Sequence, residues 1–215
     1  HLPSEFRNRL ARLEVSGIKS AGAVVLVDER WRRRPVALVK GNNNIDQPLL
    51  DAQHYLRQAL NPFTEVRTGD IAELLGRPLS MMIIADSETP VQDEVALLKA
   101  WLDKGGVLVR FAGPNLARDA GIADPMLPVK LRRGNRVVGG SLSWGKPERL
   151  APFPKTSPFY GLAIPEDVYV RRQVLAEPSL DLTSKTWAQL GDGTPLVTAE
   201  RRGEGWLVLV HTTAD

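Results

Sequence analysis

Side chains that could take part in catalysis are few, and two of them lie where apolar runs end. His211 follows the run 206–210, and Asp86 ends the run 81–86. The sequence has no cysteine, which excludes thiol nucleophiles, thiolate metal sites and disulfides. The acidic residues are scattered, and no two histidines have metal-ligand spacing. We therefore expect neither a metal site nor a cofactor.

Two further segments resemble chemical motifs but lack a defining feature. The run 139–144 contains Ser141 and Ser143 without the Gly-x-Ser-x-Gly pattern of a serine nucleophile, and it falls outside a strand-to-helix turn. The loop 41–44 has one glycine and three asparagines, without the spacing of a Walker or Rossmann phosphate loop. We interpret it as a simple turn. A lone histidine at a strand end, such as His211, is more often a structural hydrogen-bonding group than a catalyst.

The first half of the chain alternates short apolar runs with amphipathic segments, which is typical of a parallel α/β sheet. We expect strands at 36–40, 64–68, 81–86 and 107–112, and helices at 47–60, 70–75 and 90–104. In the last helix Thr89 is a suitable N-cap, Pro90 takes the favoured first position and Gln92 completes a capping box. Gly105 and Gly106 end this helix, where a left-handed residue is needed.

The pattern changes after residue 120, where long helical periods stop. Strands are expected at 129–132, 136–142, 168–175, 196–201 and 206–211, the last returning to the main sheet. The predicted fold is α/β and flavodoxin-like, with a mainly parallel sheet and helices on both faces. Residues 1–120 and 201–215 would form this core, and residues 121–200 a mostly β insertion within the same domain.

In doubly wound sheets, ligands bind at the carboxyl ends of the strands, so the loops that follow the predicted strands are candidate sites. The candidate ligand-binding residues in these loops are Gly41, Asn42, Asp86, Ser87, Gly113, Asn115 and His211. Polar groups that converge in a pocket at this edge would indicate a binding or catalytic site.

The order of these elements resembles class I glutamine amidotransferases. It runs through a capped helix, a Gly-Gly stop, a buried strand and, much later, a strand that ends in histidine. In that family an elbow near Cys-Leu-Gly and a His-Pro-Glu sequence supply a Cys-His-Glu triad. The matching segments here are 111–113, which reads Phe-Ala-Gly, and 211–213, which reads His-Thr-Thr.

The resemblance implies a degenerate triad. Phe111 stands at the nucleophile position and Thr213 at the acid position, so only His211 is kept. Asp86 and Ser87 stand where the family has its Gly-Gly oxyanion loop, which places a carboxylate where negative charge must be stabilised. We expect a module that is not an enzyme and that binds a small ligand or a protein partner. The alternative is a hydrolase with a non-standard site near His211 and Asp86.

Five segments carry distinctive motifs: 101–115, 127–131, 139–144, 172–178 and 193–199. Together they are similar to the middle region of a family of large bacterial inner-membrane proteins of unknown function, with N-terminal transmembrane helices like those of aerotolerance regulators. The resemblance implies that the parent protein is anchored in the inner membrane, on a side that the sequence does not define. The start at His1 rather than Met is expected for a fragment of a longer protein.

The formal net charge of +3 comes from one local patch. Residues 1–40 hold nine basic and four acidic side chains, whereas the remainder holds 19 basic against 21 acidic. The patch centres on Arg30, Arg32, Arg33 and Arg34. We expect a solvated loop or a segment that faces lipid headgroups, and no nucleic-acid site, because interleaved aromatic residues and a dispersed basic face are lacking. No run approaches the roughly 18–20 apolar residues of a membrane-spanning helix, so a soluble domain is expected.

Overall fold

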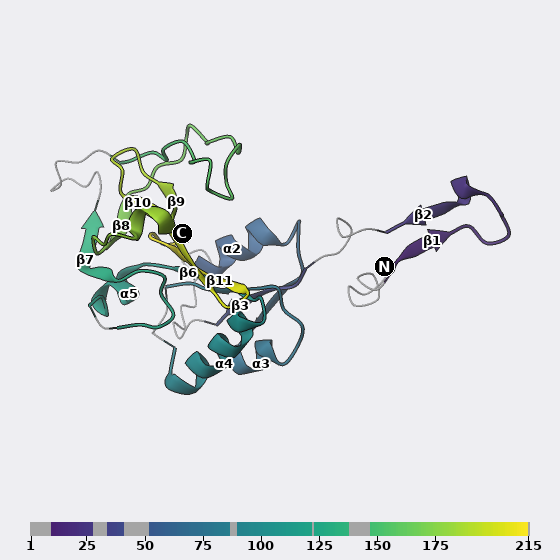
Figure 1. The fold of residues 1–215 in the computed structure, drawn as a ribbon, viewed down its shortest axis with the longest axis horizontal. Coiled ribbons are helices and arrows are strands. Elements are labelled where there is room, and N and C mark those ends of the chain that lie inside the picture. Colours follow the sequence, from purple (N-terminus) through teal and green to yellow (C-terminus); the bar gives the residue numbers. More distant parts are fainter. Residues whose placement is uncertain are drawn as a thin grey trace.

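A seven-stranded sheet forms the centre of the molecule. Its strands are β3 (Val36–Val39), β4 (Val66–Gly69), β5 (Met81–Ile84), β6 (Val107–Phe111), β9 (Thr186–Gln189), β10 (Pro195–Arg202) and β11 (Gly205–Val210). Their order is β4-β3-β5-β6-β11-β10-β9 (Figure 1). The first five are parallel, and β10 and β9 are antiparallel to their neighbours. The computed structural model describes residues 10–27, 34–40, 52–86, 90–121, 123–137 and 147–214.

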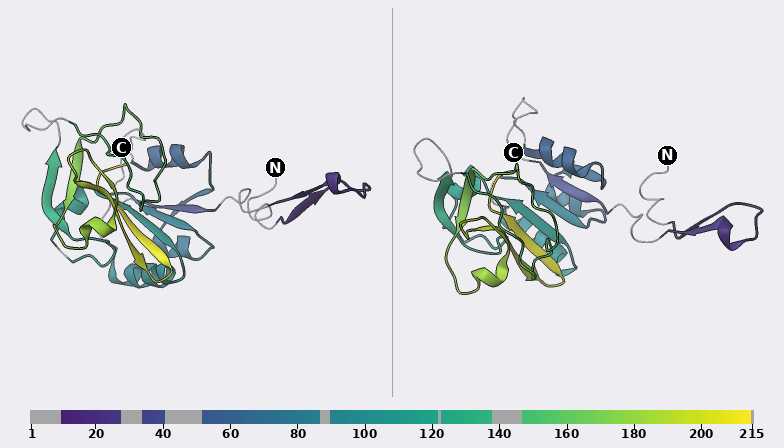
Figure 2. Two further views of the ribbon diagram at one scale, coloured as in Figure 1. Left: turned by 45° about the horizontal axis from the view of Figure 1, so that its top comes forward. Right: turned by 90° about the horizontal axis from the view of Figure 1, so that it is seen from above.

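Helices cover both faces of this sheet. They are α2 (Ala52–Leu60), α3 (Ile71–Leu75), α4 (Gln92–Asp103) and α5 (Pro114–Arg118). Leu98 of α4 and Leu108 of β6 lie in one apolar cluster, whereas Leu56 of α2 packs with Leu38 of β3 in another. Because side chains alternate along a strand, the two clusters lie on opposite faces. The predicted α/β architecture, mainly parallel with helices on both faces, is confirmed (Figures 1 and 2).

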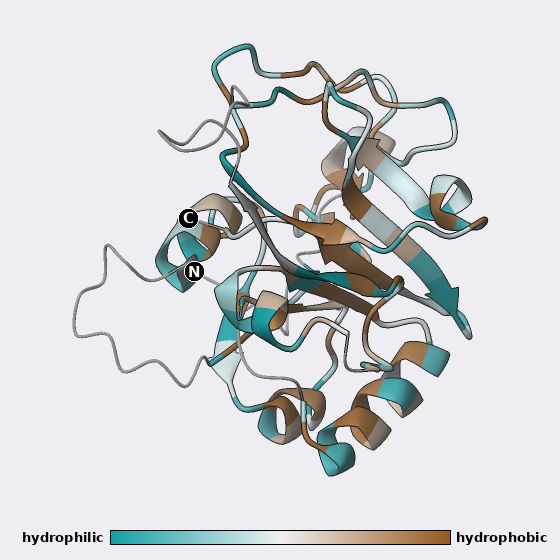
Figure 3. Ribbon diagram, turned by 90° about the vertical axis from the view of Figure 1, so that its left-hand side faces the viewer, coloured by the Kyte–Doolittle hydropathy of each residue, from teal (hydrophilic) through white to brown (hydrophobic). Residues whose placement is uncertain are grey.

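The apolar residues concentrate where the sequence pattern predicts. Figure 3 shows apolar colour along the central strands and mixed colour on the helices beside them. The strands expected to begin near residues 36, 64, 81, 107 and 206 are all present, within about two residues. The helix expected at 47–60 is present over α2, and its first residues lie outside the described part of the chain.

Helix α4 begins two residues later than predicted. Val91 is the N-cap, and its backbone N–H donates to the Glu94 carboxylate at 3.0 Å. Glu94 therefore supplies the reciprocal half of the capping arrangement that was expected from Gln92. Thr89 lies outside the described residues. The predicted stop is present, since Gly105 has a φ of +101° directly after the helix.

The segment 121–200 departs from the predicted insertion. β7 (Leu131–Val137) and β8 (Arg172–Ala176) form a separate antiparallel pair, followed by the short helix α6 (Leu182–Lys185). β7 is one strand where two were expected, with a register shift between Leu131 and Asn135. β9 and β10 belong to the central sheet instead of an insertion, because β10 forms a hairpin with β11 through a turn at Gly203.

An N-terminal hairpin lies apart from the central sheet (Figures 1 and 2). It consists of β1 (Arg12–Glu14), the short 3-10 helix η1 (Ala21–Ala23) and β2 (Val24–Leu26). The cross-strand partners Leu13 and Val25 are 53% and 57% exposed. No helix within the described residues is both long and apolar enough to cross a membrane.

Candidate functional site

Asp86 lies beyond the end of β5, at the edge where the parallel strands end. Its carboxylate accepts backbone hydrogen bonds from Asn115 and Leu116, both at 2.9 Å, and the Asn115 side-chain amide donates to the Asp86 carbonyl at 3.1 Å. These two N–H groups belong to the first turn of α5 and have no partner within the helix. Asp86 therefore caps α5 from a neighbouring loop.

Gly113 allows this close approach. A Cβ atom at this position would lie 2.5 Å from the Asp86 Oδ2 atom and 2.6 Å from the Thr213 Cγ2 atom. The φ of Gly113 is −136°, which is extended backbone. No non-glycine residue in the described ranges has a positive φ. The strained strand-to-helix turn that presents a nucleophile in an elbow is therefore absent from the described residues.

Phe111 and His211 lie on opposite faces of the sheet. Phe111 pairs in register with Val210 and packs partly buried beside β3 and β5, on the face that α2 covers. His211 is the next residue after Val210, so its side chain points to the other face, where it meets β8 and β10. The residues at the nucleophile and base positions of the triad are thus separated by the sheet.

His211 is fully buried, and both of its ring nitrogens are hydrogen bonded. Nδ1 lies 2.8 Å from the Val174 carbonyl oxygen, and Nε2 lies 2.9 Å from the Thr198 hydroxyl. Since a carbonyl only accepts, Nδ1 donates and Nε2 accepts from Thr198. Burial lowers the pKa of His211 to about 4, against a smaller opposing effect of the Val174 carbonyl. The neutral ring joins β11 to β8 and β10.

The structure thus groups three of the seven predicted ligand-binding residues. Asp86, Gly113 and Asn115 meet at the carboxyl edge, with Thr213 beside them. His211 points instead into the core between β8 and β10. Gly41, Asn42 and Ser87 lie outside the described residues, as do Arg30, Arg32 and Arg33 of the basic patch.

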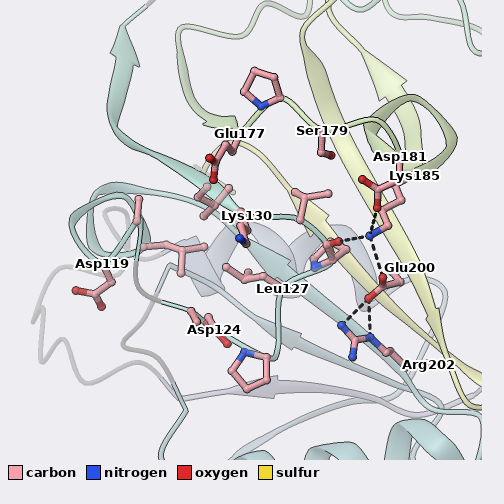
Figure 4. A pocket seen from close by; sticks show the side chains of 18 residues that line it. Asp119, Asp124, Leu127, Lys130, Glu177, Ser179, Asp181, Lys185, Glu200 and Arg202 are labelled. Atoms are coloured by element: carbon pink, nitrogen blue, oxygen red, sulfur yellow. Dashed lines mark hydrogen bonds and ion pairs between the residues drawn. The ribbon is translucent and has the colours of Figure 1, made fainter.

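A recess of about 530 Å³ lies between β7 and the α6–β10 side of the molecule (Figure 4). Its apolar surface comes from α5, the segment after it and the start of β7: Leu116, Ala120, Leu127, Val129 and Leu131. Charged side chains line the rest. Sequence patterns did not reveal this recess, because its walls come from segments that are separated by up to 86 residues along the chain, from Leu116 to Arg202.

Lys185 connects three segments of the chain that line the recess. Its Nζ atom lies 2.7 Å from the Asp181 carboxylate, 2.9 Å from the Glu200 carboxylate and 3.1 Å from the Pro128 carbonyl. Hydrogen bonds to Asp181 and then Glu200 raise the pKa of Lys185, and the bond from Lys185 lowers the pKa of Asp181 to about 2. Arg202 also donates to Glu200, at 2.6 Å from Nε. The network fixes α6 against β10.

A buried ion pair adjoins the recess, which Asp124 lines. The Arg110 side chain in β6 is 2% exposed and pairs through Nη1 with Asp124, whose side chain is 5% exposed. Asp124 also accepts the Met126 backbone N–H at 2.8 Å. The pair holds the segment after α5 against the sheet. Among the described residues, no group of three or more histidine and acidic side chains could hold a metal ion.

The parallel core, the flanking helices and the strand-to-α5 junction define a class I glutamine amidotransferase-like fold. The cytoplasmic protein STM1381 from Salmonella typhimurium LT2 is similar in structure, with a TM-score of 0.60 and 10% identity over 85% of this chain and 89% of that one. The cytoplasmic protein STM3548 from Salmonella typhimurium has a TM-score of 0.57 and 10% identity over 84% of this chain and 87% of that one.

An enzyme shares this fold over part of its length. The β-galactosidase from Bacillus circulans sp. alkalophilus matches with a TM-score of 0.56 and 14% identity, covering 85% of this chain and 29% of that one. No family model matches the sequence, and no curated protein does. At these identities the likeness establishes the fold alone.

Proposed function

We propose that this chain is a non-catalytic amidotransferase-like module that binds a small ligand or a protein partner. The main support is the position of Asp86, whose carboxylate accepts hydrogen bonds from the backbone N–H groups in the first turn of α5. Acyl transfer needs free N–H donors where the oxyanion develops. Here the position that the resemblance assigns to the oxyanion loop holds the Asp86 carboxylate, and the backbone N–H groups of Asn115 and Leu116 beside it are bound to that negative charge.

The residues at the nucleophile and base positions, Phe111 and His211, are also unsuited to acyl transfer. Phe111 offers no lone pair to attack an amide. His211 points away from Phe111 across the sheet, both of its ring nitrogens are engaged, and its lowered pKa makes it a weak base at neutral pH. These features favour binding over the alternative of a hydrolase near His211 and Asp86.

Turnover assays test this proposal. We expect no ammonia release from glutamine, and no hydrolysis of a chromogenic acetate ester, above the buffer blank. The same assays on Asp86→Asn and His211→Gln show whether any activity depends on these two residues. Far-UV circular dichroism verifies that each variant is folded. Hydrolysis by the unmodified chain that either substitution abolishes while the fold is retained would overturn the proposal in favour of the hydrolase.

We further propose that the module belongs to a larger, membrane-anchored bacterial protein. The support is the motif similarity of the five segments between residues 101 and 199 to a family of inner-membrane proteins. An antibody raised against this chain should detect the parent protein in the inner-membrane fraction of the source cells. Detection only in the soluble fraction would contradict this part of the proposal.

A further inference from the structure

The N-terminal hairpin is a sheet of only two strands, β1 and β2, and no other strand in the described part of the chain pairs with it. A two-stranded hairpin is marginally stable in water, whereas three or more strands with an apolar face are stable by themselves. The hairpin also lies apart from the central sheet (Figures 1 and 2). A further strand beside β1 or β2 would therefore supply what the hairpin lacks.

One face of the hairpin is apolar throughout. It is formed by three cross-strand pairs, which are Ala11 with Val27, Leu13 with Val25, and Val15 with Ala23. Because side chains alternate along a strand, these pairs share one face. Leu13 is 53% exposed, and Val15 and Val25 are each 57% exposed. The apolar face needed for a larger sheet is thus already present.

The outer edge of β1 has backbone groups that are open to another strand. In an antiparallel pair, successive residues direct their N–H and C=O groups alternately toward the partner strand and away from it. The Val15 N–H donates to the Ala23 carbonyl at 2.9 Å, so the backbone groups of Leu13 and Val15 face the opposite strand. Those of Arg12 and Glu14 point away from it, and no other segment in the described ranges forms a backbone hydrogen bond with them.

The charges along this edge fit a second copy of the same strand. Antiparallel pairing about a two-fold axis at Leu13 would place Arg12 of each copy opposite Glu14 of the other, with the two Leu13 side chains facing each other. Opposite charges directly across a strand pair are stabilising, and like charges are destabilising. In the single chain Arg12 pairs with Glu14 at 3.0 Å, and their side chains are 63% and 57% exposed. Both are accessible to a second copy.

The outer edge of β2 is less suited to pairing. Its outward residues are Val24 and Leu26, which carry no charge that would select a register. The Val24 N–H already donates to the Ala21 carbonyl of η1. The β1 edge, with unpaired backbone groups and alternating charges, is therefore the edge at which a specific partner strand can bind.

We propose that two copies of this chain associate by antiparallel pairing of their β1 strands. The product is a four-stranded sheet in the order β2-β1-β1-β2, with one continuous apolar face. Its two-fold axis passes between the Leu13 side chains, with an Arg12–Glu14 pair on either side. Because the paired strands are short, the interface is smaller than the roughly 800 Å² per partner of a stable complex, and the dimer is weak. This association is separate from the ligand or partner binding proposed above.

Sedimentation equilibrium of the full chain tests the association. We expect the average mass to rise toward that of two chains between about 10 µM and about 1 mM, as for a weak interface. A chain that stays monomeric throughout this range would overturn the proposal. Monomers that bind phosphatidylglycerol vesicles through the hairpin would instead assign its apolar face to lipid.

Two charge variants distinguish pairing of β1 strands from any other contact. Arg12→Glu leaves two acidic residues on this edge, and Glu14→Arg leaves two basic ones. Each variant alone should dimerise at least about tenfold more weakly, because symmetric pairing places like charges opposite each other twice. An equimolar mixture should form a heterodimer at least as tight as the unmodified dimer, and this recovery would show that the hairpin is formed in both variants.

A matched control separates register-specific pairing from general charge attraction. Arg171→Glu and Asp167→Arg make the same charge changes at exposed positions outside the hairpin. Each control should dimerise within about twofold of the unmodified chain, and their mixture should show no preference for the heterodimer. The proposal fails if the β1 variants alone dimerise as tightly as the unmodified chain, or if their mixture prefers the heterodimer no more than the control mixture does. Neither result bears on turnover at Asp86 or His211.

Discussion

His211 makes the stability of this protein depend on pH. Its pKa is lowered from 6.5 to about 4 by burial, so the unfolded chain binds a proton more readily than the folded one. The stabilisation is fully present above about pH 6.5 and is lost as the pH falls from 6.5 to 4. The total is about 3 kcal/mol, at 1.36 kcal/mol per pKa unit.

We therefore predict that the free energy of unfolding in urea falls more between pH 7 and pH 4.5 for the unmodified chain than for His211→Gln. The variant is expected to be less stable at pH 7 and to lose most of the pH dependence in this interval. If the free energy of unfolding fell equally with pH in the two proteins, protonation of His211 would not be the cause of the pH dependence.

At the scale of residues, the sequence predicted positions better than hydrogen-bond partners. Asp86, Gly113 and Asn115 follow strands whose carboxyl ends share one edge, so their proximity could be expected. The hydrogen-bond partners of His211 could not, because Val174 and Thr198 lie 37 and 13 residues away along the chain. The capping role of Asp86 also depends on α5, which the sequence pattern did not indicate.

Among the elements, strand β6 contains a buried charged residue, Arg110, which pairs with Asp124. Because Arg110 and Asp124 are both buried, removing one partner leaves an unpaired buried charge, at a cost of about 3–5 kcal/mol. Asp124→Asn should therefore lower the urea midpoint strongly. The double variant Arg110→Met, Asp124→Leu should regain most of the loss, because apolar residues of similar volume often replace a buried pair without penalty. A double variant as unstable as the single one would show that the pair itself is required.

The antiparallel strands show why the sequence pattern missed β9 and did not place β10 in the central sheet. β9 has only four residues, and its register with β10 shifts twice, so alternation along it is weak. β10 was recognised as a strand, but its place in the central sheet depends on the tight hairpin with β11. The strands of the parallel core, by contrast, are apolar on both faces and are recognisable from sequence.

For the molecule as a whole, the N-terminal hairpin is a separate part. None of its residues belongs to the apolar clusters of the described core. Removal of residues 1–27 should shift the urea midpoint of the central domain by an amount within the error of measurement, because a hairpin alone adds little stability. A truncated chain that unfolds at clearly lower urea, or without cooperativity, would show that the hairpin packs on the domain.

Asp86 has a structural role at the carboxyl edge of the sheet, where its carboxylate caps α5. Functional residues are often held at a cost in stability, so replacing a catalytic carboxylate tends to stabilise a protein, whereas replacing a cap destabilises it. We predict that Asp86→Ala loses about 2 kcal/mol in a urea melt, because two charge-assisted hydrogen bonds to α5 are removed. The exposed control Asp167→Asn should change stability by less than about 0.5 kcal/mol. An Asp86→Ala variant as stable as the unmodified chain, or more stable, would contradict the claim that this edge of the sheet is closed by the protein's own carboxylate.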